Sequence, residues 1–98
     1  MIQRYSILQN SMTNCFVCGT TKNIHIHEVF YGTAHRQISI KEGLCVALCG
    51  KHHNLSKNGV HQDHELDLRL KQLFQTEWLS QHNNDLDLWF KIFRRSWI

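Results

Sequence analysis

The sequence contains no proline, only five glycines and no long apolar run. The scarcity of proline and glycine argues against a long disordered linker. No stretch approaches the roughly 20 apolar residues that a membrane span needs, and the first ten residues have neither the apolar centre nor the cleavage site of a secretory signal peptide. We therefore expect a single cytoplasmic domain over residues 1–98 that does not contact a membrane.

The chain of 98 residues lies at the small end of what one hydrophobic core stabilises unaided. A structural metal commonly compensates in scaffolds of this size. The four cysteines are consistent with this, because thiols stay reduced in the cytosol, where cysteine spacing indicates metal ligands rather than disulfides. The net charge of +3 permits a phosphate-bearing partner without requiring one.

Two short ligand pairs predict a structural zinc site. Cys15 and Cys18 are separated by two residues, and Cys49 and His52 repeat that spacing. Tetrahedral zinc takes four ligands of these types, usually paired on two turns. Cys45 competes with His52 as the fourth ligand, but it falls within an expected strand, so the spacing favours His52.

The segment 15–61 predicts two strands and a helix around this zinc. Residues 24–30 alternate β-branched or aromatic residues with polar ones, which indicates a strand. We expect a polar loop over 32–39, a second strand over 44–48 and a short helix over 50–57, while 38–43 is ambiguous. The fold class is therefore α+β, with a zinc-stapled β-hairpin and a helix.

The segment 63–98 predicts one or two further helices. Asp63 is a candidate N-cap for a helix over 64–81. Its expected buried stripe is Leu66, Leu70, Leu73, Phe74 and Trp78, with Leu68 and Leu79 exposed on the other side. A final helix is expected to start near Asp85 and to carry on one face Leu86, Trp89, Phe90, Phe93 and Trp97. This face most simply packs on the core, and the alternative is a homodimer or protein-partner surface.

Four ionisable residues form a second candidate cluster: His27, Glu28, His53 and His61. Hydrolysis of a phosphodiester with a divalent ion needs ligands that leave positions open for substrate and water, and a general base beside that water. His27 and Glu28 can supply a base and a ligand, while His53 and His61 complete the coordination. The histidines that we expect to be ordinary surface or hydrogen-bonded residues are His25, His64 and His82.

The residues from 15 to about 80 resemble the HNH endonucleases, and more closely the small phage-encoded HNH proteins with a zinc-knuckle frame. The resemblance rests on four runs: Cys15-x2-Cys18-Gly19, His27 to Arg36, Leu48-Cys49-x2-His52-His53-Asn54, and Gly59-Val60-His61. It extends into Glu65-Leu-Asp-Leu-Arg-Leu-Lys71. It implies a ββα-metal, or His-Me finger, fold that grips one Mg²⁺ or Mn²⁺ and nicks or cleaves DNA. It also implies a phage or mobile-element protein that acts in the cytoplasm of a bacterial host cell.

Two positions depart from that family. An acidic residue or histidine usually precedes the histidine base, whereas here His27 precedes Glu28. Position favours Glu28 as the base. The ordinary histidine pKa near 6.5 favours His27 as the base and Glu28 as the ion's ligand, and we favour this second assignment. His35 stands where the family has an asparagine that braces the loop, so it joins the candidate catalytic residues.

The cations expected to contact DNA phosphates are Arg36, Lys51 and Lys57. The sequence therefore predicts a metal-dependent DNA endonuclease with a structural zinc. The alternative is a non-catalytic zinc module that binds nucleic acid or a protein partner. That alternative gives no role to His53 and His61, which zinc alone does not require.

Overall fold

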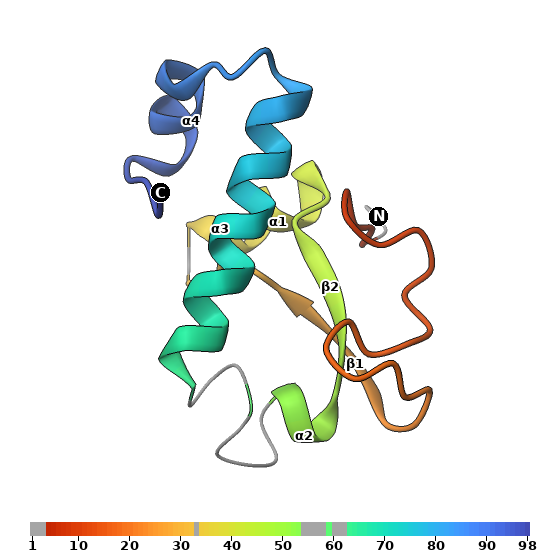
Figure 1. Ribbon diagram of the computed structural model, residues 1–98. Coiled ribbons are helices and arrows are strands. Elements are labelled where there is room, and N and C mark those ends of the chain that lie inside the picture. Colours follow the sequence, from red (N-terminus) through yellow and green to blue (C-terminus); the bar gives the residue numbers. More distant parts are fainter. Residues whose placement is uncertain (1–3, 33, 54–58, 60–62) are drawn as a thin grey trace.

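A computed structural model describes residues 4–32, 34–53, 59 and 63–98 (Figure 1). The elements in chain order are β1 (Ile24–Glu28), α1 (His35–Glu42), β2 (Cys45–Cys49), α2 (Gly50–His53), α3 (His64–Gln81) and α4 (Leu86–Phe93). α3 lies across the two-stranded hairpin, α4 folds back beside α3, and α2 lies at the far end of β2. The expected α+β class is confirmed.

The hairpin decides which side chains share a face. β1 and β2 pair antiparallel, with Ile24 opposite Cys49 and Glu28 opposite Cys45. Because side chains alternate along a strand, His25 and His27 leave β1 on one face and Glu28 leaves it on the other. β2 is buried at every position, as expected for a strand covered on both sides.

Helix α1 corrects the expectation of a polar loop over 32–39. Its sequence has only a weak apolar stripe, so the pattern did not indicate a helix. A buried hydroxyl holds it in place, because Ser39 Oγ accepts a hydrogen bond from Phe30 N at 3.1 Å and donates one to Phe30 O at 2.6 Å. Gly43 ends the helix with φ of 76°, a conformation that glycine adopts without strain. A Cβ at Gly43 would also clash with the ring of Tyr5.

Helix α3 begins and ends where the sequence predicts. The Asp63 carboxylate accepts hydrogen bonds from Glu65 N and Leu66 N, both at 3.1 Å, which satisfies two of the unpaired N–H groups of the first turn. The predicted stripe is wrong at two positions. Leu73 is 49% exposed, whereas Leu79 is only 7% exposed and belongs to the core cluster.

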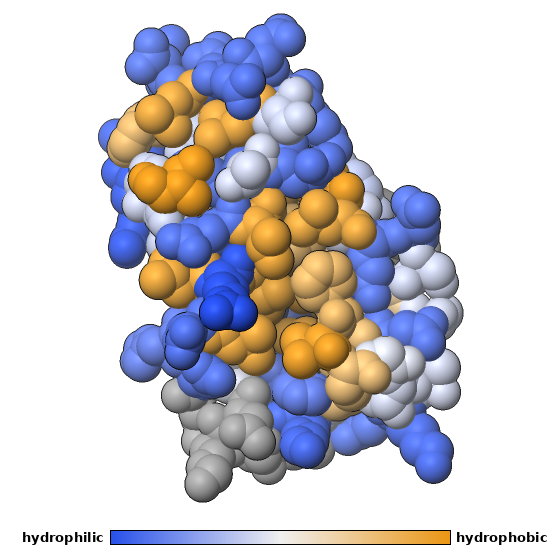
Figure 2. Space-filling view, viewed as in Figure 1, coloured by the Kyte–Doolittle hydropathy of each residue, from blue (hydrophilic) through white to orange (hydrophobic). Residues whose placement is uncertain are grey.

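The C-terminal helix completes the core around Phe30. The Phe30 ring centroid lies 4.9 Å from Phe93, 5.4 Å from Trp89 and 4.8 Å from Trp97. Trp89 and Phe93 of the expected stripe are buried, while Phe90 is 43% exposed. Figure 2 shows apolar side chains gathered over the middle of one face.

Candidate metal centre

The first ligand pair lies on a tight turn that is hydrogen-bonded at both ends. Cys15 N donates to Thr20 O and Gly19 N donates to Cys15 O, both at 2.8 Å. Gly19 has φ of 79°, which closes the turn. Phe16 N donates to Ala47 O at 2.8 Å, so the turn is fixed to strand β2.

The second ligand pair lies at the junction of β2 and α2. Cys49 is the last residue of β2 and His52 belongs to α2. Gly50 N donates to Asn23 O at 2.9 Å and holds the start of α2 against the chain that enters β1. The local hydrogen bonds thus bring the two pairs to the same end of the hairpin.

The four side chains meet in a geometry that suits zinc. One ligand atom each from Cys15, Cys18, Cys49 and His52 lies within 4.8 Å of the others. Sγ of Cys18 and Cys49 are 3.7 Å apart, and His52 Nδ1 is 3.7 Å from Cys15 Sγ and 3.3 Å from Cys49 Sγ. Zinc bonds of about 2.3 Å to sulfur and about 2.0 Å to nitrogen, in a regular tetrahedron, separate two sulfurs by about 3.8 Å and sulfur from nitrogen by about 3.6 Å. The cluster could therefore hold a metal such as zinc, with His52 bound through Nδ1.

Cys15 inside this cluster and Cys45 outside it have pKa values shifted in opposite directions. At Cys18, also inside the cluster, a backbone hydrogen bond to Thr20 lowers the pKa, but burial and the neighbouring Cys15 and Cys49 thiols raise it above its ordinary value. Burial raises the pKa of Cys15, but backbone hydrogen bonds, chiefly from Cys49 and Cys18, together with the His52 ring, bring it down from 9.0 to about 6. A thiol with a lowered pKa is readily present as the thiolate that binds metal. Burial, with the neighbouring Glu28 carboxylate, raises the pKa of Cys45 from 9.0 to about 12.

Cys45 is not among the four residues that form the metal cluster. Its Sγ–H donates to Ser39 O at 3.8 Å, and the residue is fully buried on the face of the hairpin that carries Glu28. The expected choice of His52 over Cys45 agrees with this geometry.

Three histidines meet beside the metal cluster. Nδ1 of His25 lies 2.9 Å from Nδ1 of His53, and the ring centroid of His53 lies 5.2 Å from that of His27. His53 follows the ligand His52 directly, so binding a metal at His52 would also fix His53. The structure thus brings together His27 and His53, as expected, and adds His25, which the sequence analysis set aside.

The spacing of His25 and His27 in the sequence could have indicated that His25 joins this group of histidines. His25 and His27 are two residues apart on a strand, so both side chains point to the same face. A ligand search along β1 that used period two would have paired them.

Glu28 is not brought to these histidines. Its carboxylate lies on the other face of the hairpin, 3.6 Å from Arg4 and 3.5 Å from Arg36. The expected ion site of Glu28, His53 and His61 is therefore not assembled by the described residues, and His61 lies outside them. Arg36, expected to contact DNA, pairs with Glu28, and its side chain is 61% exposed.

The other predicted site residues are dispersed. His35 begins α1 and lays its ring on Phe93, with centroids 5.3 Å apart, rather than bracing a loop. Lys51 is exposed on α2, and Lys57 lies outside the described residues.

Tyr31 connects the histidines to α3. Its ring centroid lies 5.8 Å from that of His27, and Lys71 Nζ stands 4.2 Å from it on the other side. Burial raises the pKa of Tyr31, and the charge of Asp67 and a hydrogen bond to it act in the same direction. The sequence analysis missed Tyr31, because a single tyrosine after a strand carries no spacing signal.

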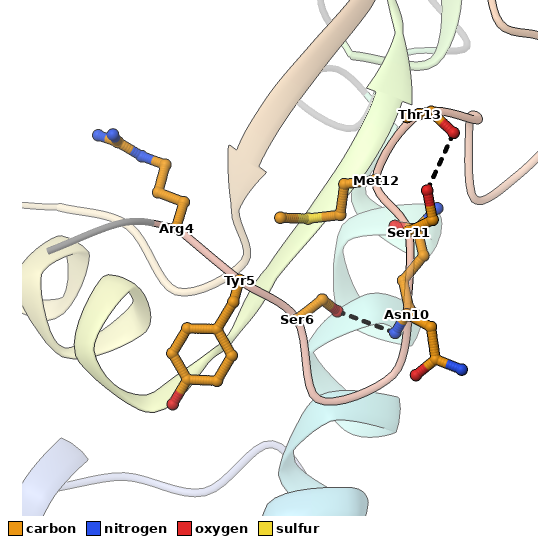
Figure 3. A pocket seen from close by; sticks show the side chains of 8 residues that line it. Arg4, Tyr5, Ser6, Asn10, Ser11, Met12 and Thr13 are labelled. Carbon is orange, nitrogen blue, oxygen red and sulfur yellow. Dashed lines mark hydrogen bonds between the residues drawn. The ribbon is translucent and has the colours of Figure 1, made fainter.

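A separate hollow of about 790 Å³ is lined by residues within 4–13 (Figure 3). Ser6 Oγ accepts hydrogen bonds from Leu8 N and Gln9 N, which curls the segment. None of the residues that line this hollow is a cysteine, a histidine or a carboxylate.

Comparisons of the chain with protein-family models, with curated proteins and with solved structures gave no match. In the described part of the chain, no helix combines the length and the hydropathy that crossing a membrane requires. The candidate site must therefore be interpreted from its own geometry.

Proposed function

We propose that this chain is a zinc-framed, metal-dependent DNA endonuclease of the HNH type. The observation that carries the proposal is the position of His53. It directly follows the ligand His52, and its ring centroid lies 5.2 Å from that of His27. A structural zinc at the end of the hairpin would hold two imidazoles together on one face of β1.

Imidazoles suit the two tasks that phosphodiester hydrolysis sets. A neutral imidazole accepts a proton near neutral pH, so it can act as a general base. It can also bind a divalent cation through a ring nitrogen. We assign the base to His27, which is 3% exposed, and the holding of the cation to His53.

A divalent cation such as Mg²⁺ or Mn²⁺ would supply neutralisation of charge on the scissile phosphate. The side chains available to hold this cation are imidazoles, which are nitrogen donors. The carboxylate of Glu28 is not available for it, because it pairs with two arginines. Nitrogen donors favour later transition metals over Mg²⁺. We therefore expect Mn²⁺ to support activity better than Mg²⁺, and Ni²⁺ belongs among the ions tested.

Nicking of a supercoiled plasmid tests the proposal. The zinc-loaded chain is compared with His27→Ala, His53→Ala and His82→Gln in titrations of Mg²⁺, Mn²⁺ and Ni²⁺. His82 is the matched control, because its ring stacks on Trp78 at 3.8 Å, at the far end of α3. We expect His27→Ala to lower the nicking rate by about 10²–10⁴-fold and His82→Gln to nick like the parent.

Two results would count against an endonuclease. One is a parent chain that does not nick DNA with any of the three ions while it holds zinc and stays folded. The other is a His27→Ala variant that nicks as fast as the parent. Binding of DNA without nicking would favour the non-catalytic zinc module.

A further inference from the structure

A cleft of about 550 Å³ lies on the α3 side of the histidines. Its walls come from the chain after β1, the first half of α3 and the segment after α4, and none of the four metal-cluster residues lines it. The volume falls within the roughly 300–1,000 Å³ that is typical of small-molecule sites.

One wall of the cleft is aromatic and firmly held. The Trp97 ring packs 4.8 Å from Phe30. Its backbone is tied to α3 at both polar atoms, because Trp97 N donates to Gln75 Oε1 at 2.8 Å and Gln72 Nε2 donates to Trp97 O at 2.9 Å. The ring position is therefore fixed by the backbone, and a change of side chain leaves these anchors in place.

The part of the cleft that α3 contributes carries one positive and one negative side chain, which neutralise each other. Lys71, only 7% exposed, holds both carboxylate oxygens of Asp67 at 2.6–2.7 Å. Among the described residues that line the cleft, the remaining formal charge belongs to Arg95, whose guanidinium carbon lies 4.7 Å from the centroid of the Trp97 ring. His35 and His64 also line the cleft. The cleft thus offers aromatic surface, one exposed cation and two imidazoles, which suits a flat ring that carries one anionic group.

We infer that this cleft binds one nucleotide of single-stranded DNA, with the base taking the place of the Arg95 guanidinium on the Trp97 ring and the phosphate paired with that guanidinium. Aromatic faces and a cationic groove are the usual means of holding single strands. A base that is paired and stacked in a duplex cannot enter, so the cleft selects an unpaired strand. Tyr31 borders both the cleft and His27, so one side chain separates the cleft from the histidines. The choice of DNA rests on the proposed function.

Fluorescence anisotropy of a labelled 12-residue oligothymidylate tests the inference without added Mg²⁺ or Mn²⁺, so that binding is measured apart from cleavage. Arg95→Gln is compared with Arg94→Gln, a matched control that loses the same charge from the neighbouring exposed position outside the cleft. We expect only Arg95→Gln to reduce the salt dependence, by about 0.7 in the slope of log K against log salt. Trp97→Leu should weaken binding on the order of tenfold, and Trp97→Phe should retain most of it.

The arms of the experiment separate this inference from the proposed function. The inference is overturned if a duplex of the same length binds as tightly as the single strand. It is also overturned if the two arginine variants lose affinity equally. Cleft-dependent binding by a chain that never nicks DNA would refute the proposed function alone. If nicking depends on His27 but the affinity for the single strand is unchanged by substitutions at Arg95 and Trp97, this inference alone is refuted.

Discussion

Replacing Cys18 and Cys45 by serine, one at a time, distinguishes metal binding from packing. Cys18 is exposed and Cys45 is fully buried. If packing alone set the stability, Cys18→Ser would be nearly neutral, because surface substitutions usually stay within about 0.5 kcal/mol. Cys45→Ser would then be the more harmful change, because it places a hydroxyl in the core.

If the chain binds zinc, Cys18→Ser is the more destabilising of the two substitutions. Apparent binding free energies of structural zinc are about 10–16 kcal/mol, which matches or exceeds the about 5–15 kcal/mol by which small domains are stable. Loss of one of four ligands therefore removes a large part of the free energy of unfolding. In Cys45→Ser the new hydroxyl can donate to Ser39 O, the present partner of the thiol, so we expect a cost of only about 1 kcal/mol.

The assay combines metal analysis with thermal unfolding of the two purified variants. We expect Cys45→Ser to keep one zinc per chain and a melting temperature within several degrees of the parent. Cys18→Ser should lose the zinc and its cooperative transition. A more stable Cys18→Ser than Cys45→Ser, or zinc retained by the former and lost by the latter, would refute the ligand assignment.

Three further predictions follow from other contacts. Glu28→Gln should leave the dependence of nicking on Mg²⁺ or Mn²⁺ unchanged, because the carboxylate pairs with Arg4 and Arg36; a clear rise in the ion concentration needed would restore Glu28 as a ligand. The raised pKa of Cys45, about 12 against 9.0, means that the buried thiol contributes stability below about pH 9 that is lost as the pH rises towards 12. Cys45→Ala should therefore lose less stability than the parent between about pH 8 and about pH 10.5 in urea unfolding, and an equal loss would argue against the shift. Asp63→Ala should cost about 1 kcal/mol in the same assay while Asp63→Asn costs little, because both Asp and Asn cap the first turn of α3; equal costs for the two variants would show that the hydrogen bonds of the cap contribute nothing.

Local signals in the sequence predicted part of the fold well. The capping Asp63 fixed the start of α3, because a side-chain carboxylate meets the first N–H groups in a way that depends on nearby residues only. The local spacing of Cys15 with Cys18 and of Cys49 with His52 predicted which residues are ligands, although the cluster joins the two pairs across more than 30 residues of chain.

Features that depend on distant contacts were missed. Helix α1 is held by a hydrogen bond from the Ser39 hydroxyl to the backbone of Phe30, nine residues away. The pattern of apolar residues within the helix does not predict such a bond. Glu28 was placed beside His27 because they are neighbours in sequence. On a strand, neighbours point to opposite faces, and the arginine partners of Glu28 come from the N-terminal segment and α1.

X-ray absorption at the zinc edge of the purified chain reports the ligand atoms themselves and so decides whether the four-residue metal centre exists. We expect one zinc per chain with three sulfur neighbours at about 2.3 Å and one nitrogen neighbour at about 2.0–2.1 Å, from Cys15, Cys18, Cys49 and His52. A shell of four sulfurs would mean that Cys45 replaces His52. That result would contradict the assignment of His52 as a zinc ligand, on which the position of His53 in the proposed active site depends.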